Sequence, residues 1–422
     1  MHARAGLALL SWHLKDLHPL WVFVAACILG SSGILWLKSG LGESDLALEP
    51  SAISLFIPFL VCGLYLFFLT ITGRIGHNRS TFCTIFLFLL NAFCFFGYFE
   101  EPLWHFYYDD PGRYSAYAKF MISQGTLWGN DAVSGVSANT PFFIDQPGYR
   151  YYLASMMLIV GDENRLLQLL NLFVYLSTLL LLLSKIDHDS KTSGRWICLF
   201  FVASLPYAAS NILEGLSEWF AVSLFCLSVY TALQNWKLLA IICLALLPVV
   251  RQNLILFAFC YAIILIVLEP DSKRRLLYAI SFILITLLPV YHNLFYAGEW
   301  QLISSNKGNM IPWNQSFDHI VKTFFEIIIR KLPQYIGYYE TASMTRTTIT
   351  VAFAPLGTAL VGYFLFRFRG YRQFFFFLTI ILVAGPTTLF GWGYFPRLVF
   401  ANLTLVLASL PLIQYAFPDH NK

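Results

Sequence analysis

The sequence predicts an all-α polytopic membrane protein, with about twelve transmembrane helices in one integral membrane domain over residues 1–422. Of the 422 residues, 58% are hydrophobic and only 12% are charged, whereas soluble globular proteins carry about 25% charged residues. The apolar residues form continuous runs such as 53–72 and 374–389, and a helix of about 20 apolar residues spans the hydrocarbon core. Because these runs do not alternate apolar with polar residues, they exclude a membrane barrel.

The expected spans follow the apolar runs in order, with polar loops or long polar segments between them. They cover residues 19–37, 53–72, 80–98, 166–184, 196–213, 217–233, 238–250, 253–268, 276–296, 349–366, 374–392 and 398–415. The net charge of +4 is scattered, and no basic stretch indicates a nucleic-acid partner. All cysteines fall inside apolar runs without a CxxC pair, so they are interpreted as buried small side chains.

The distribution of Lys and Arg predicts that both termini lie in the cytoplasm. Most basic residues then fall in short inside loops or tails, whereas the short outside loops carry only Lys38, Arg251 and Arg397. Two long segments, 99–165 and 297–348, lie outside in this arrangement. Residues 114–124 and 316–332 each place apolar side chains on one helical face, so both are expected to be helices in the membrane interface.

Polar residues gather on the predicted outer side, first in the long segment 99–165. This segment contains Tyr108-Asp109-Asp110-Pro111-Gly112-Arg113-Tyr114 and then Asp145-Gln146-Pro147-Gly148-Tyr149-Arg150-Tyr151-Tyr152. The outer ends of other spans add further polar residues: Glu214, Glu218, Arg251, Asn253, His292, Asn293 and Arg397. The inside loops show no comparable cluster, so a functional site is expected at the outer interface.

The order of these motifs resembles the GT-C glycosyltransferases, and most closely the protein O-mannosyltransferase and aminoarabinose-transferase group. On this resemblance, Asp110 matches the catalytic Asp, Arg113 and Tyr114 match an Arg-Tyr pair, and Pro147 matches a proline pair. The resemblance covers about residues 99–170 and is weaker around Arg251 and Arg397. The chain has Pro111 where the family has Glu, with Asp109 upstream, and Gln146 where it has Lys, so Arg150 becomes the expected phosphate ligand.

The resemblance implies sugar transfer from a polyprenyl-phosphate donor to a lipid-linked or cell-envelope acceptor, on the outer face of a bacterial inner membrane. Asp110, with Asp109 as the alternative, would be the general base. The residues expected to bind substrate or phosphate are Arg113, Tyr114, Gln146, Tyr149, Arg150, Arg251 and Arg397. The sequence leaves a divalent metal open. A transporter or flippase of lipid-linked saccharide, and an O-antigen polymerase or ligase, are the alternative functions.

Each of these residues also has a purely structural interpretation. Asp110 before Pro111 is a good helix N-cap, and Arg150 and Arg165 could extend to lipid headgroups. Glu214 and Glu218 lie at i and i+4, which suits a metal or a second acid, although an exposed turn is the favoured interpretation. His292 is expected to be an interfacial histidine that neighbouring groups satisfy.

Overall fold

The computed structural model describes residues 110–125, 147–189, 212, 215–297, 300, 361–389 and 396–418. Within these residues all regular structure is helical and no strand occurs, which confirms the all-α part of the prediction. The expected spans 19–37, 53–72 and 80–98 lie outside the described residues, as do nearly all of 196–213 and most of 349–366. The total of about twelve spans therefore stays a prediction.

Several expected spans correspond closely to single helices. The spans 166–184, 217–233, 238–250, 253–268 and 374–392 become, in order, α7 (Asn164–Asp189), α9 (Ser217–Leu233), α10 (Lys237–Val250), α11 (Ile255–Val267) and α18 (Tyr371–Leu389). A short 3-10 turn, η2 (Gln252–Leu254), separates α10 from α11. The long apolar runs formed helices because these side chains lose little freedom in a helix and bury well.

Two expected spans are broken where single spans were predicted. The span 276–296 divides into α12 (Ser272–Thr286) and α13 (Leu288–Ala297), with a bend of 42° between them. The span 398–415 divides into α19 (Pro396–Ala408) and α20 (Leu410–Ala416). Pro289 and Pro411 stand directly after the two breaks. Proline lacks a backbone N–H and its ring clashes with the carbonyl four residues earlier, so a helix cannot pass through it undisturbed.

By length and composition, one helix of the described residues, or two if a bent pair counts as one span, could cross a membrane. Arg165–Leu183, 19 residues with a mean hydropathy of 2.2, is long and apolar enough to cross a bilayer. The bent pair Ser272–Thr286 and Leu288–Phe295 meets the same criterion if it forms one broken span. The other apolar helices of the described residues have 10–17 residues, which is shorter than the roughly 20 residues of a typical span.

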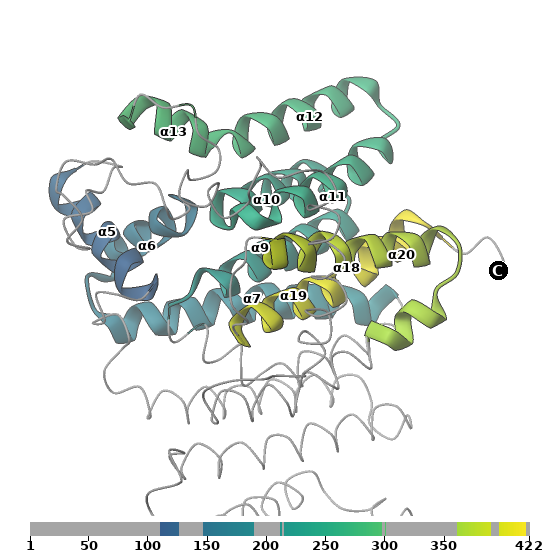
Figure 1. The fold of residues 1–422 in the computed structure, drawn as a ribbon, viewed down its shortest axis with the longest axis horizontal. Coiled ribbons are helices and arrows are strands. Elements are labelled where there is room, and N and C mark those ends of the chain that lie inside the picture. The colour runs from purple at the N-terminus through teal and green to yellow at the C-terminus, as the bar shows by residue number, and fades with distance from the viewer. Residues whose placement is uncertain are drawn as a thin grey trace, which may run out of the picture.

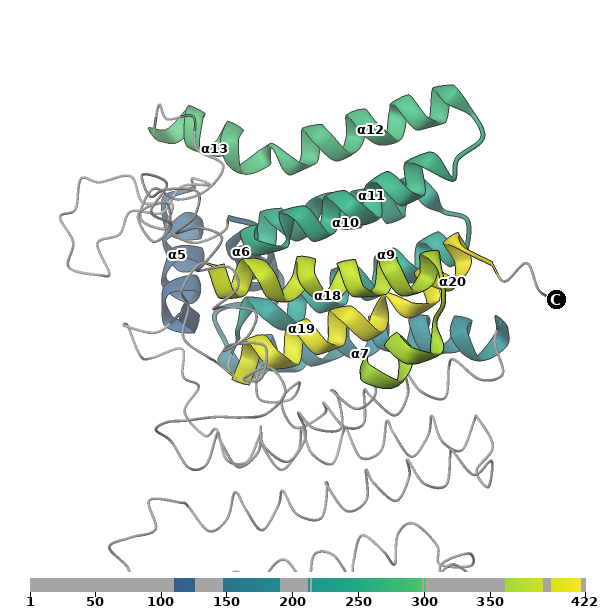
Figure 2. The same ribbon diagram turned by 45° about the vertical axis from the view of Figure 1, so that its right-hand side comes forward.

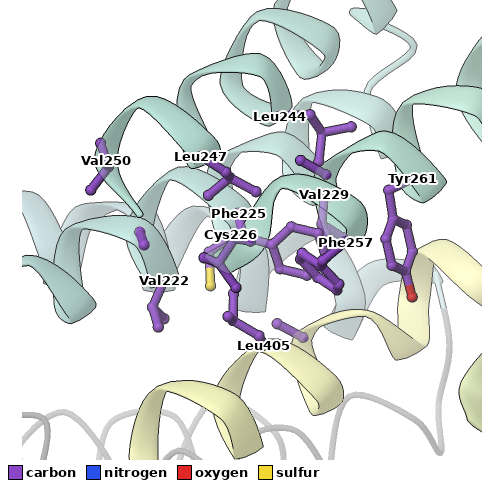
Figure 3. Packing of buried hydrophobic residues seen from close by; sticks show 14 of the residues in the cluster. Val222, Phe225, Cys226, Val229, Leu244, Leu247, Val250, Phe257, Tyr261 and Leu405 are labelled. Atoms are coloured by element: carbon purple, nitrogen blue, oxygen red, sulfur yellow. The ribbon is translucent and has the colours of Figure 1, made fainter. Parts of the chain in front are cut away.

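The long helices lie lengthwise in a stacked array, with α9 in its interior (Figures 1 and 2). Helix α9 packs against α7, α10 and α19. Figure 3 shows the core where α9, α10, α11 and α19 meet, including Phe225, Leu244 and Leu405. The rings of Phe225 and Phe257 lie 4.7 Å apart at the centre of this core. Its buried side chains fix the positions of the helix ends, where the polar residues lie.

The connections predicted on the inside gather at one end of the array. There Tyr415 donates a 3.1 Å hydrogen bond to Asn235, Lys237 Nζ lies 2.9 Å from Glu269 Oε2, and the Arg372 guanidinium donates to the Phe417 carbonyl. The last described residues, which follow α20, lie at this end as well (Figure 1). Helices α5 (Asp110–Gln124) and α6 (Pro147–Val160) lie at the opposite end. The grouping of the loops thus agrees with the predicted arrangement.

Candidate functional site

Helix α5 carries the acidic motif at its beginning. It starts at Asp110, so Asp110 is its first residue and Pro111 its second. The purely structural alternative for Asp110, an N-cap just before the helix, differs from this by one position. Tyr114, Tyr117, Ala118 and Met121 are all buried. The predicted apolar face of residues 114–124 is therefore confirmed, except that Ile122 is exposed.

Helix α6 was not predicted: the sequence analysis gave residues 147–152 only as part of a polar motif in the long segment 99–165. Its buried residues are Pro147, Tyr149, Arg150, Leu153, Ala154 and Met157. These positions repeat at intervals of three and four, which is the spacing of one helical face. Proline at the first position of a helix is favourable, because its missing N–H would have no partner there. Both signals are present in the sequence.

The beginning of α6 lies directly against the end of α10. A Cβ atom on Gly148 would lie 2.9 Å from the carbonyl oxygen of Val249, a separation that real side chains do not tolerate. Glycine therefore permits this contact. It brings Tyr149 and Arg150 beside the chain segment that carries Arg251.

Tyr149 is an anchor of this end of the bundle. It is fully buried and its ring lies 5.1 Å from that of Tyr114, edge to face. Trp219 Nε1 donates a 3.3 Å hydrogen bond to its hydroxyl oxygen. Burial, with a smaller contribution from Tyr152, raises the pKa of Tyr149 well above its ordinary value. Its hydroxyl is therefore neutral, and its contacts hold α5, α6 and α9 together.

Arg150 is 2% exposed, and its guanidinium carbon lies 4.9 Å from the ring centre of Tyr117. A cation over an aromatic face is stabilised by the ring electrons. A side chain extending to headgroups would be exposed, so that interpretation of Arg150 is wrong. Arg165, by contrast, is exposed at the start of α7.

Arg251 and Glu218 form a buried ion pair, with Arg251 Nη1 at 3.3 Å from Glu218 Oε1. The two side chains are 3% and 2% exposed. The expectation that Glu218 lies in an exposed turn is therefore wrong, while Glu214 lies outside the described residues. Glu218 is buried because Arg251 is its partner, since a carboxylate is buried only where an opposite charge compensates it. Arg251 follows Glu218 by more than thirty residues, so local spacing could not reveal the pair.

Further polar contacts connect this ion pair to α5, the helix that bears the acidic motif. Arg251 Nη1 donates a 3.2 Å hydrogen bond to Ser217 Oγ. Ser217 Oγ in turn lies 3.4 Å from the hydroxyl of Tyr114 on α5. Residues from α5, from α9 and from the junction between α10 and η2 thus make one buried polar chain, hereafter the Glu218–Tyr114 chain. Ser217 was not singled out from the sequence, because an isolated serine carries no signal.

A second set of polar contacts surrounds Tyr151 and Tyr152. The Tyr151 hydroxyl forms a hydrogen bond with His292 Nδ1, which confirms that a neighbour satisfies this histidine. The Tyr152 hydroxyl donates a 2.8 Å hydrogen bond to Asn171, a fully buried residue of α7 that the sequence analysis did not identify. Helix α6 is thereby joined to both α7 and α13.

The remaining predicted site residues are only partly described. Asp109 and Gln146 lie outside the described residues. Asp110 and Arg113 are placed on α5 and Arg397 on α19 by their backbone positions alone. Their convergence with Arg150 and Arg251 stays a prediction. Among the described residues, no group of three or more His, Cys, Asp or Glu side chains could hold a metal ion.

The comparisons with known proteins identify no relative. No protein-family model, curated protein or solved structure matches the chain.

Proposed function

We propose that the chain is a membrane glycosyltransferase of the GT-C type, which moves a sugar from a polyprenyl-phosphate donor to a lipid-linked or cell-envelope acceptor. One observation carries the proposal. Helix α5, which bears the acidic motif, and helix α6, which bears the buried Arg150, lie at the same end of the bundle as Arg251. An acid and phosphate-binding groups from separate stretches of chain are thus available at one end, as this chemistry needs.

Exposed apolar faces support a membrane location. On α11 the exposed large apolar residues are Leu256, Phe259, Ile263 and Val267, and on α12 they are Leu276, Leu277, Ile280, Ile283 and Leu284. Both sets follow helical spacing, so each helix presents a continuous apolar stripe. Soluble proteins rarely expose contiguous apolar surfaces of this kind. Contact with lipid tails explains them, and it agrees with the low charge of the sequence.

The proposed reaction is a displacement at the anomeric carbon of the donor sugar. Asp110, or Asp109, takes the proton from an acceptor hydroxyl as the hydroxyl oxygen bonds to that carbon. The bond from the carbon to the phosphate oxygen breaks, and the electron pair leaves with the polyprenyl phosphate. Arginine stabilises the leaving phosphate, because its planar group can donate two parallel hydrogen bonds to phosphate oxygens.

The position of the buried charges argues against a transporter or flippase. Secondary transporters bind their substrates near the bilayer midplane. In the described residues, the buried charged side chains are Arg150, Glu218, Arg251 and Glu269. The first three lie at the α5–α6 end and Glu269 lies at the other end, so none is at mid-bundle. An O-antigen polymerase or ligase also uses lipid-phosphate chemistry, but without an acidic motif early in the chain.

The test is a transfer assay with the purified full chain in lipid nanodiscs. Polyprenyl-phosphate sugars with a labelled sugar are supplied together with envelope extracts, and products are separated by chromatography and identified by mass spectrometry. We expect labelled product with the wild-type chain and a loss of about 10²–10⁴-fold in rate when the base is replaced, by Asp110→Asn or Asp109→Asn. Near-normal turnover in both variants would refute the mechanism. Products elongated by whole, unlabelled repeat units, which only lipid-linked oligosaccharides of the extract can donate, would instead favour the polymerase.

A further inference from the structure

Glu218 lies beside the proposed site, although it belongs to none of the motifs that suggested the reaction. Its carboxylate is buried against Arg251, at 3.3 Å from the nearer guanidinium nitrogen. It stands in the first turn of α9, whereas Arg251 immediately precedes η2. The pair therefore ties the start of α9 to the residue that follows α10.

The Glu218–Tyr114 chain connects this pair to the acidic motif. Arg251 donates to Ser217, and Ser217 contacts the Tyr114 hydroxyl. Tyr114 follows Asp110 by four residues on α5, and residues four apart lie on the same side of a helix, one turn from each other. One network of polar contacts therefore sets both the direction of the Arg251 guanidinium and the position of α5.

A buried ion pair contributes little to the net stability of a fold. Removing two charges from water is costly, and replacing both partners by neutral side chains is often harmless or stabilising. Loss of one partner is strongly destabilising, because it leaves a buried charge without compensation. A network that fixes one guanidinium and the acidic helix together is better explained by a need for orientation.

We propose that Glu218 is a positioning residue: it fixes the Arg251 guanidinium and, through Ser217 and Tyr114, its placement relative to the acid at the start of α5. This inference rests on the proposed sugar transfer. Glu218 does not touch the reacting atoms. Its role is to hold the phosphate-binding group and the base at the separation that the reaction requires.

The first test shortens the carboxylate without removing its charge. In Glu218→Asp, the pair keeps its compensation, so the thermal unfolding midpoint stays close to that of the wild type. Arg251 must shift to follow the shorter side chain, and a misplacement of about 1 Å can cost about 10²-fold in rate. We therefore expect turnover per folded molecule to fall by about that factor, with a smaller change in the KM for the donor.

A matched control exists at the opposite end of the bundle. Glu269 forms a similar ion pair with Lys237, with 2.9 Å between Oε2 and Nζ. Glu269→Asp makes the same shortening far from α5 and α6. It should leave turnover per folded molecule unchanged, so a loss seen only in Glu218→Asp is specific to the site.

The second test separates orientation from stability. In the double variant Glu218→Gln with Arg251→Gln, both side chains are neutral and no charge stays buried. We expect the unfolding midpoint to recover relative to Glu218→Gln alone, while turnover stays about 10²-fold below wild type, as for the loss of a preorganised donor. This variant also decides the matter if Glu218→Asp does not fold.

Two results would overturn the inference. One is a folded Glu218→Asp variant with wild-type turnover, and the other is a double variant whose turnover recovers together with its stability. Either would make the pair purely structural. These results require an active wild-type chain, whereas a wild type that transfers no sugar from any polyprenyl-phosphate donor refutes the proposed function itself.

Discussion

The carbonyl oxygen of Val249 lies close to Gly148: a Cβ atom added to this glycine would be only 2.9 Å from that oxygen. This contact seats the first turn of α6 on the last turn of α10. Arg150 follows Gly148 by two residues, and Arg251 follows Val249 by two residues. The absence of a side chain at Gly148 therefore sets how closely the two arginine-bearing segments approach.

The first prediction concerns this contact. Gly148→Ala forces α6 away from α10, because the obstacle is backbone that cannot rotate aside. Overpacking of this kind typically costs about 1–3 kcal/mol, so a lower thermal unfolding midpoint is expected, with a loss of transfer activity. Gly362→Ala is the control, since no atom lies within 4 Å of its added Cβ and the residue stands in a helix. It should be neutral or stabilise the chain, because alanine is favoured over glycine within a helix by about 0.5–1 kcal/mol. Equal behaviour of the two variants would contradict the prediction.

The second prediction separates the buried Arg150 from the exposed Arg165. Lysine keeps the positive charge but lacks the planar fork that holds two phosphate oxygens. Arg150→Lys should therefore raise the KM for the donor and lower turnover, by about 10²-fold if one preorganised donor is lost. Arg165→Lys should be nearly silent, because an exposed lysine extends to headgroups as well as arginine does. The kinetics of transfer in nanodiscs measure both. A silent Arg150→Lys would remove this residue from the phosphate site.

The sequence predicted the helices well where the signal was local. The span expected at 217–233 is α9 with the same bounds, because its apolar run is limited by Gly215 on one side and by Asn235 on the other. Both of these residues adopt positive φ angles, which end or begin a helix. The break between α12 and α13 was missed although Pro289 marked it, since hydropathy averaged over a window does not detect one proline.

The site was predicted less well, for a different physical reason. Arg251 could be selected because an arginine between two apolar runs is costly and needs a role. Arg150 was selected because the resemblance requires a phosphate ligand and the chain has Gln146 at the position of the family's lysine. Glu218 was interpreted as exposed and Ser217 was not noticed, because their environment depends on Arg251 and Tyr114, which lie far from them in the chain. Burial of a charge is decided by such distant partners, and one sequence carries no signal for them.

The third prediction concerns the ion pair at the loop end. The pKa of Glu269 is lowered, mainly by the hydrogen bond from Lys237. A carboxylate with a depressed folded-state pKa stabilises the fold above its unfolded-state pKa of about 4.3, and this contribution is lost as the pH falls through the folded-state value. The difference in thermal midpoint between wild type and Glu269→Gln should thus be constant near neutral pH and shrink below about pH 4.3. If the difference in thermal midpoint between the two proteins does not change with pH, even down to the folded-state pKa of Glu269, this prediction is wrong.

The last prediction concerns the side of the membrane on which the α5–α6 end lies. The loops at the other end carry the exposed basic residues Lys273, Arg274, Arg275, Arg367 and Arg369, and basic loops remain in the cytoplasm. The α5–α6 end should therefore face outward, where a sugar acceptor of the envelope would be available. Asp162 is exposed at that end, close to the start of α7, and Lys273 is exposed at the other end.

Single cysteines at these two positions, placed in a chain without native cysteines, measure the orientation directly. Asp162→Cys should react with a membrane-impermeant thiol reagent in intact spheroplasts, and Lys273→Cys only after lysis. Cysteines at Ser137 and Asn309, within the two long segments assigned to the outside, should behave like Asp162→Cys. Because position 162 joins α6 to α7, its labelling locates the proposed site itself. Labelling of Lys273→Cys in intact cells, with Asp162→Cys protected, would place the acidic motif in the cytoplasm and exclude transfer on the outer face.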